Sequence, residues 1–200
     1  MNLFGRYKKG QLIAPAAPHR KGTKDSPVSR IDNVQTVIIP MAMHIGKPAV
    51  PVVKVGDTVK IGTKIGEADG KVSSEIYSSV SGKVVKIVEH LLYSGQTTSA
   101  VVIDSDGEKT VDESIAPPVI NNQQDFIEAV KKSGLVGLGG AGFPTQVKLD
   151  VPCEKIEFLL INGAECEPYV TSDSVNMLTR TDDIILALNA LHRYLGVKNV

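Results

Sequence analysis

Apolar and polar residues alternate along most of residues 34–104, and glycines interrupt the pattern at short intervals. The stretch "PAVPVVKVGDTVKIGTKIGEA" (48–68) alternates Val and Ile with polar residues, and "SSEIYSSVSGKVVKIVEH" (73–90) does so again after a turn. A period of two is typical of strands with one buried face, and no helical period appears here. This half of the chain is therefore predicted to fold as a small β barrel or sandwich.

The pattern changes after residue 122. The sequence "SDGEKTVDESIAPPVINN" (105–122) has the composition of a linker. Helical patterns follow at 123–134 and 181–196, and "KIEFLLIN" (155–162) is a dense apolar run typical of a buried parallel strand. "VKNV" (197–200) begins a further strand. One complete strand cannot close an α/β core, so we expect these residues to be the front of a longer domain.

These patterns predict four parts. They are an extended N-terminal arm (1–30), a β domain (31–105), a linker (106–122) and the N-terminal part of an α/β domain (123–200).

Composition excludes several function classes. Lys+Arg and Asp+Glu are both 22, aromatic residues make up 4% and tryptophan is absent, which argues against nucleic-acid binding. The two cysteines, Cys153 and Cys166, have neither zinc nor iron–sulfur spacing and are interpreted as reduced thiols. We find no signal peptide and no apolar run of membrane-spanning length, so any membrane association is expected to come through a partner. His44 is interpreted as a hydrogen-bonding residue at the barrel edge rather than a metal ligand.

A glycine-rich loop, "GLGGAG" (137–142), is followed by Phe143, a predicted helix start at Pro144 or Thr145, and Lys148. Glycines leave backbone N–H groups accessible, a helix N-terminus carries partial positive charge, and a lysine adds a full one. The pattern favours an anion cradle for a nucleotide phosphate. It is neither a P-loop nor a complete dinucleotide fingerprint, and a packing turn without a ligand is the alternative.

Polar residues in "NGAECEPY" (162–169) follow the predicted strand 155–162. The carboxyl ends of parallel strands are where α/β sheets bind ligands. Asn162 offers an amide to a ring edge or a ribose hydroxyl, and Glu165 and Glu167 offer acceptors. The alternative is an acidic turn that caps the next helix.

The motifs "GLVGLGGAGFPTQVKL" and "INGAECEPYVTSD" look like the FMN- and NADH-binding flavoprotein subunit of respiratory complex I. With "HIGKPAVPVVKVGDTVKIGTKIG" (44–66) in front, residues 34–200 more closely resemble the C subunits of Rnf (Rsx) electron-transport complexes. Residues 52–87 are also similar to lipoyl/biotinyl-type barrel-sandwich domains. Lys71 falls near the modified lysine of that family, although a solvated turn lysine is the simpler interpretation. The implied fold is a barrel-sandwich followed by the start of a Rossmann-like FMN/NADH-binding domain.

The Rnf resemblance implies a peripheral subunit of an ion-translocating ferredoxin:NAD oxidoreductase on the cytoplasmic face of the cell membrane. Such a subunit binds FMN and NAD(H) and passes electrons to 4Fe-4S clusters, which are expected only downstream of residue 200. Its partners are the other Rnf subunits and ferredoxin or an iron–sulfur subunit. A docking scaffold without a redox site, or a soluble flavin reductase, are the alternatives, and residues 1–200 alone are expected to be inactive.

The resemblance also implies residue roles, with no catalytic residue and no metal ligand among them. Lys148 and the loop glycines hold the flavin phosphate and ribityl chain, Asn162 and Glu165 contact the flavin, Phe143 stacks on adenine and Glu167 contacts NADH. The glycines are Gly137, Gly139, Gly140 and Gly142.

Overall fold

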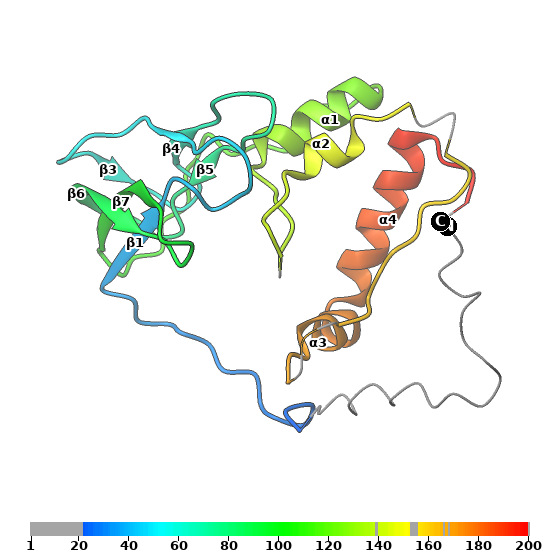
Figure 1. Ribbon diagram of the computed structural model, residues 1–200, viewed down its shortest axis with the longest axis horizontal. Coiled ribbons are helices and arrows are strands. Elements are labelled where there is room, and N and C mark those ends of the chain that lie inside the picture. The colour runs from blue at the N-terminus through cyan, green and yellow to red at the C-terminus, as the bar shows by residue number, and fades with distance from the viewer. Residues whose placement is uncertain (1–21, 139, 153–155, 166, 168, 200) are drawn as a thin grey trace.

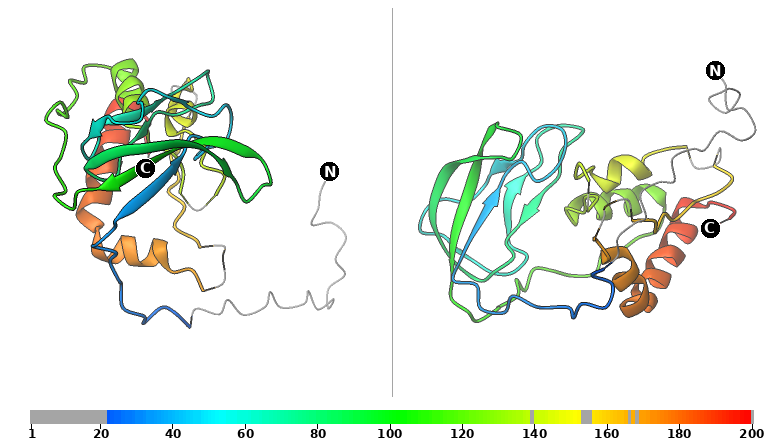
Figure 2. Two further views of the ribbon diagram at one scale, coloured as in Figure 1. Left: turned by 90° about the vertical axis from the view of Figure 1, so that its left-hand side faces the viewer. Right: turned by 60° about the horizontal axis from the view of Figure 1, so that its bottom comes forward.

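The computed structural model describes residues 22–138, 140–152, 156–165, 167 and 169–199. The first half folds into seven antiparallel strands arranged in two sheets (Figures 1 and 2). One sheet has the order β1-β7-β6-β3 and the other β2-β4-β5. The strands are β1 (Thr36–Pro40), β2 (Val50–Pro51), β3 (Thr58–Val59), β4 (Lys64–Glu67), β5 (Ile76–Tyr77), β6 (Gly82–Leu91) and β7 (Thr97–Ser105). The predicted barrel-sandwich is confirmed.

The barrel core lies between these two sheets. Its buried side chains come from both of them and from the loop that follows β1, which is why the alternating pattern specifies the fold. They are Ile39, Met41, Ala49, Val59, Ile65, Ile76, Val84, Val101 and Ile103.

Two loops cross at the end of the barrel nearest the helices. We call residues 43–47 the His44 turn and residues 68–75 the β4–β5 loop. The Lys47 N–H donates to the Val72 carbonyl at 3.0 Å, and the Ser73 hydroxyl donates to the Lys47 carbonyl at 2.8 Å. Lys71 is exposed within the β4–β5 loop.

The second half contributes four helices: α1 (Gln123–Lys132), α2 (Thr145–Leu149), α3 (Ser172–Thr179) and α4 (Thr181–Leu195). The Asn122 side chain caps α1 by accepting from the Asp125 N–H, and Gly196 ends α4 in the left-handed conformation. Phe126 of α1 stacks on Tyr194 of α4 with ring centroids 5.2 Å apart, which anchors a second, smaller core.

The predicted strand at 155–162 is wrong for the residues that are described. Residues 156–162 form no strand, and their one bridge joins Phe158 to Asn199 in parallel. Phe158 is 59% exposed and Leu160 is 85% exposed. An apolar run becomes a buried strand only when neighbouring strands pair with it and cover both faces. A Rossmann-like sheet is therefore not confirmed.

The segments between these units run along the surface. At the start of the linker, Val111 pairs with Ile61 in an isolated parallel bridge. Residues 26–34 form neither helix nor strand and pass from near α3 to the barrel (Figure 1). At the α3 end of this segment, the Thr23 hydroxyl donates to the Tyr169 carbonyl.

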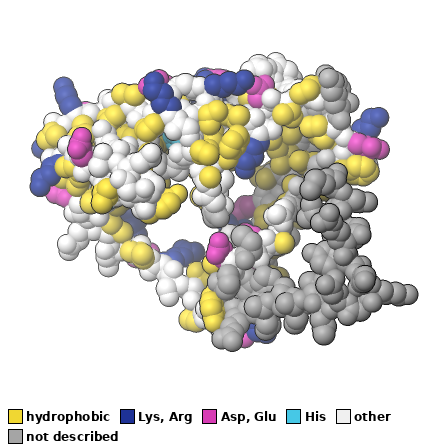
Figure 3. All heavy atoms as spheres, viewed as in Figure 1, with side chains coloured by type: hydrophobic (Ala, Val, Ile, Leu, Met, Phe, Trp, Pro, Cys, Tyr) yellow, Lys and Arg dark blue, Asp and Glu magenta, His cyan; other side chains and the backbone are white. Residues whose placement is uncertain are grey.

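Charges are dispersed on the face seen in Figure 3, where basic and acidic side chains are scattered among apolar ones. Within the described ranges, no helix combines the length and the hydropathy needed to cross a bilayer.

Candidate functional site

The glycine loop is the tip of a short hairpin. Val136 and Pro144 form an antiparallel bridge, and the Thr145 N–H donates to the Leu135 carbonyl at 2.9 Å. In Figure 1 this hairpin projects from α1 and α2 into the space between the barrel and α4. The chain therefore leaves α1, turns through the glycines and returns directly into α2.

Lys148 of α2 folds back over the base of this hairpin. Its ammonium nitrogen lies 6.0 Å from the Phe143 ring centroid and 3.3 Å from where a Cβ on Gly137 would stand. No carboxylate forms an ion pair with Lys148 in the part of the chain that the structure covers. Three of the predicted site residues, Gly137, Phe143 and Lys148, therefore lie close together. Among the described residues no carboxylate neutralises the Lys148 charge, so it is available to an anion.

The four predicted glycines occupy different environments. The Gly137 N–H donates to the Phe143 carbonyl at 2.9 Å, so the prediction of a bare amide is wrong there. Gly140 is exposed, and a Cβ there would meet nothing within 4 Å. Gly142 is buried with φ +64°, and its missing Cβ faces the Met43 carbonyl of the barrel. Gly139 lies outside the described residues.

The predicted helix N-terminus contributes less than expected. Helix α2 has five residues, and the N–H groups of Thr145 and Val147 already donate to carbonyls of the hairpin. Charge at this site therefore comes mainly from Lys148 rather than from a helix dipole.

Residues of the second predicted motif form hydrogen bonds with one another and with the start of α3. The Asn162 side chain accepts from the Ala164 N–H at 3.0 Å. The Glu165 carboxylate accepts from the Asp173 N–H at 2.7 Å and from the Ser172 hydroxyl at 3.3 Å. Glu165 therefore caps α3, as in the alternative interpretation of this motif. Glu167 is exposed, and the motif's Cys166, like Cys153, lies outside the described residues.

His44 is a buried hydrogen-bonding residue, as its sequence context predicts. Its Nε2 accepts from the Ser74 N–H at 3.1 Å, so Nδ1 carries the proton and faces the Ile45 carbonyl. Gln146 is a further residue of this region that is not predicted from the sequence, and its side-chain amide donates to the Ser73 carbonyl at 3.0 Å. No local pattern marks such a contact, because the two residues are 73 positions apart in the chain.

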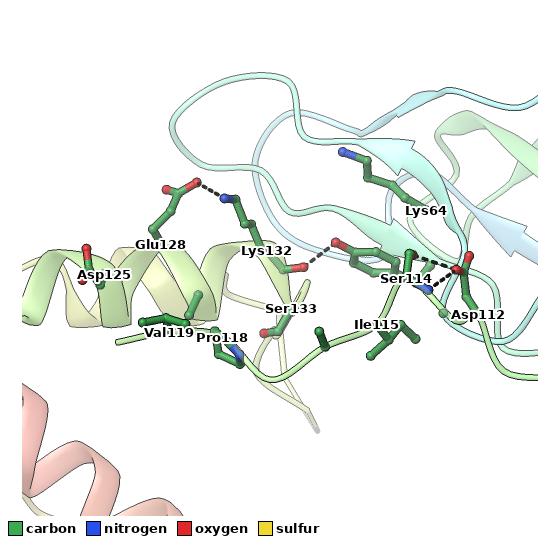
Figure 4. A pocket seen from close by; sticks show the side chains of 14 residues that line it. Lys64, Asp112, Ser114, Ile115, Pro118, Val119, Asp125, Glu128, Lys132 and Ser133 are labelled. Carbon is green, nitrogen blue, oxygen red and sulfur yellow. Dashed lines mark hydrogen bonds and ion pairs between the residues drawn. The ribbon is translucent and has the colours of Figure 1, made fainter. Parts of the chain in front are cut away.

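A cavity of about 700 Å³ lies between β4, β5, the linker and α1 (Figure 4). None of the predicted site residues lines it. Its charged groups have partners, with Lys132 near Glu128 and Asp112 accepting from Ser114. Tyr77 donates from this wall toward the Lys132 carbonyl, and burial together with a neighbouring carboxylate raises its pKa. We interpret this cavity as the groove along which the linker passes.

Two protein families match the two halves of the chain. The RnfC barrel sandwich hybrid domain matches residues 7–108, and the Nuo51 FMN-binding domain matches residues 130–200. The chain belongs to the RnfC family. The glycine hairpin, Lys148 and the second motif all fall within the FMN-binding-domain match.

Curated relatives extend the RnfC assignment along the chain. The C subunit of the Na⁺-translocating ferredoxin:NAD⁺ oxidoreductase complex of Acetobacterium woodii is 43% identical, over 99% of this chain and 45% of the relative. The C subunit of the proton-translocating ferredoxin:NAD⁺ oxidoreductase complex of Clostridium ljungdahlii is 37% identical, over 90% and 40%. The C subunit of the ion-translocating oxidoreductase complex of Pseudomonas aeruginosa is 38% identical, over 96% and 25%. The chain therefore spans less than half the length of these relatives.

Proposed function

We propose that this RnfC chain belongs to a peripheral subunit of an ion-translocating ferredoxin:NAD⁺ oxidoreductase, and that its glycine hairpin binds the phosphate of FMN. The observation that carries the proposal is Lys148, a cation without a carboxylate partner among the described residues, beside Gly137 and the Phe143 ring. It lies in the region that matches an FMN-binding domain. Relatives named as subunits of ferredoxin:NAD⁺ oxidoreductases support the reaction class.

The residues of the hairpin suit a phosphorylated ring compound. Lys148 can form a charge-assisted hydrogen bond to a phosphate oxygen, and the open space at Gly140 lets a ligand approach the backbone. The half-buried Phe143 offers a ring for stacking on the adenine of a nucleotide. Bound FMN would supply hydride acceptance and one-electron release, while the protein supplies position and charge.

The remaining parts of the proposal follow from the resemblance. NADH would be held by Phe143, whose ring would stack on the adenine, and by Glu167, which would contact the nucleotide. The remaining flavin contacts would come from Gly139, Gly142, Asn162 and Glu165. In the longer protein, iron–sulfur clusters would serve as electron acceptors, and membrane contact would come through the other Rnf subunits on the cytoplasmic face.

FMN titration of the full-length subunit, followed by quenching of flavin fluorescence, tests the proposal. Replacing Lys148 with Gln should raise the Kd roughly tenfold to a hundredfold, because a charged hydrogen bond to the phosphate is lost. The matched control is Lys131→Gln, which removes the same charge from the last turn of α1 and should leave the Kd unchanged. Wild-type protein that binds neither FMN nor NADH would refute the proposal.

A docking scaffold is the second candidate function. It is favoured by Gly137, whose amide is used internally, and by Gly142, which packs on the barrel. In that case Lys148→Gln leaves electron transfer by the assembled complex intact, and the purified full-length protein holds no flavin.

A further inference from the structure

The glycine hairpin rests directly on the barrel. The Ile45 N–H of the His44 turn donates to the Gly142 carbonyl at 3.3 Å. A Cβ on Gly142 would stand 2.7 Å from the Met43 carbonyl oxygen and 2.9 Å from the His44 Cα. Since real Cβ atoms essentially never approach that closely, this backbone-to-backbone contact requires glycine.

A second contact joins the start of α2 to the same end of the barrel. Gln146 is 6% exposed, and its amide nitrogen donates to the carbonyl of Ser73 in the β4–β5 loop. The neighbouring Ser74 N–H is held from the barrel side by His44. The β4–β5 loop is thus fixed by one side chain from the barrel and one from α2.

The oxygen of the Gln146 side chain is buried and has no hydrogen-bond partner in the part of the chain described. A buried polar atom without a partner opposes folding. That cost offsets part of the stability gained from the bond to Ser73, which fixes where the start of α2 lies against the barrel.

We propose that Gly142 and Gln146 attach the hairpin to the barrel, and that this attachment holds Lys148 over Gly137 and Phe143 in the arrangement that binds FMN. The inference rests on the proposed function and assigns Gln146 as a positioning residue. A glycine-rich tip has large conformational freedom, and ordering it opposes binding. Attachment to a rigid barrel removes part of that cost before the ligand arrives. The barrel thereby controls the affinity of a site to which it contributes no proposed ligand-binding residue.

The test compares Gln146→Leu and Gly142→Ala with wild-type full-length subunit. In the flavin-free protein, amides in residues 135–145 should exchange hydrogen roughly tenfold faster in both variants, while β6 and β7 keep their protection. Gly140→Ala should leave this exchange unchanged, because its Cβ enters open space.

Flavin titration supplies the second measurement. Gln146→Leu should raise the Kd for FMN roughly tenfold to a hundredfold. At saturation, the absorbance spectrum of bound FMN should still match that of wild type, because the residues that contact the flavin are intact. Gln124→Leu, the same change at an exposed position of α1, is the matched control for affinity.

Three outcomes are informative. Wild-type affinity and wild-type loop exchange in Gln146→Leu would overturn the inference. Faster exchange throughout the barrel in both variants would overturn it too, because the junction would then support the whole fold. If wild-type protein fails to bind FMN, the proposed function fails, and exchange in the flavin-free protein still decides whether the attachment orders the hairpin.

Discussion

Gly46 and Gly56 allow the crossing of the two barrel loops to be tested in isolation. Both glycines have nearly the same backbone conformation, with φ +100° and +98°. A Cβ on Gly46 would lie 2.1 Å from the Val72 carbonyl oxygen, whereas a Cβ on Gly56 would meet nothing within 4 Å. Comparing Gly46→Ala with Gly56→Ala therefore separates the cost of the contact from the cost of the conformation.

The structure sets the size of each effect. Forcing alanine into a positive-φ conformation should cost about 1–2 kcal/mol at either position. In Gly46→Ala the Val72 carbonyl must also move by at least about 1.3 Å, from 2.1 Å to the 3.4 Å at which ordinary van der Waals contact begins. That shift disrupts its 3.0 Å hydrogen bond from the Lys47 N–H, which adds about 1–3 kcal/mol. We expect Gly46→Ala to cost about 2–5 kcal/mol in total.

The assay is the free energy of unfolding of the barrel, measured in urea by hydrogen exchange of the amides of β6 and β7. These strands share the longest paired register among the described strands, so their exchange reports global opening of the barrel. Equal destabilisation by the two substitutions would refute the argument, because the crossing of the His44 turn and the β4–β5 loop would then contribute nothing beyond the conformation of its glycine.

Further predictions concern the core and two titratable groups. Ile103→Ala should destabilise the barrel by about 2–5 kcal/mol in urea unfolding, since Ile103 is fully buried, and a loss below about 1 kcal/mol would contradict the described core. Hydrogen bonds from Ser114 and Thr63 lower the pKa of Asp112 to about 2, so its carboxylate stabilises the folded state above about pH 4 and that contribution is lost as the pH falls toward 2. Asp112→Asn should flatten the unfolding free energy over that pH range. Burial raises the pKa of Tyr77, so stability should fall as the pH rises above 10, and an equally steep fall in Tyr77→Phe would contradict this assignment.

The barrel could be predicted because the sequence signals for its strands and turns lie within those strands and turns. Alternation with a period of two specifies which side chains face inward, and glycines such as Gly56 and Gly62 mark turns with positive φ. Helix α4 could be predicted equally well, because acidic residues mark its first turn and Gly196 follows its last turn. Each of these signals lies within the element that it specifies.

The structure of segment 156–162 could not be predicted from its own sequence. Its apolar run is indistinguishable from that of a buried strand, yet Phe158 and Leu160 are exposed in the structure. Whether such a run becomes a strand depends on distant segments that pair with it, and its one bridge among the described residues is to Asn199.

The candidate site likewise contains one part that could be predicted from local sequence and one part that could not. Gly137, Phe143 and Lys148 lie within twelve consecutive positions, so a hairpin followed by one helical turn is enough to bring them together. The contact between Gly142 and Met43 joins the glycine hairpin to the barrel. It could not be predicted, because the sequence of neither segment indicates that the other packs against it.

The glycines of one motif can therefore be required for different reasons. Gly142 needs to be glycine even without a ligand, because its φ is +64° and the barrel backbone occupies the place of its Cβ. Gly140 meets no such constraint, so in the flavin-free protein alanine should be tolerated at 140 and not at 142. If flavin binding is nevertheless lost in Gly140→Ala, the requirement at that position comes from the approaching ligand, whereas at Gly142 it comes from the fold. One glycine-rich motif can thus combine a binding requirement with a packing requirement, and only the flavin-free protein separates the two.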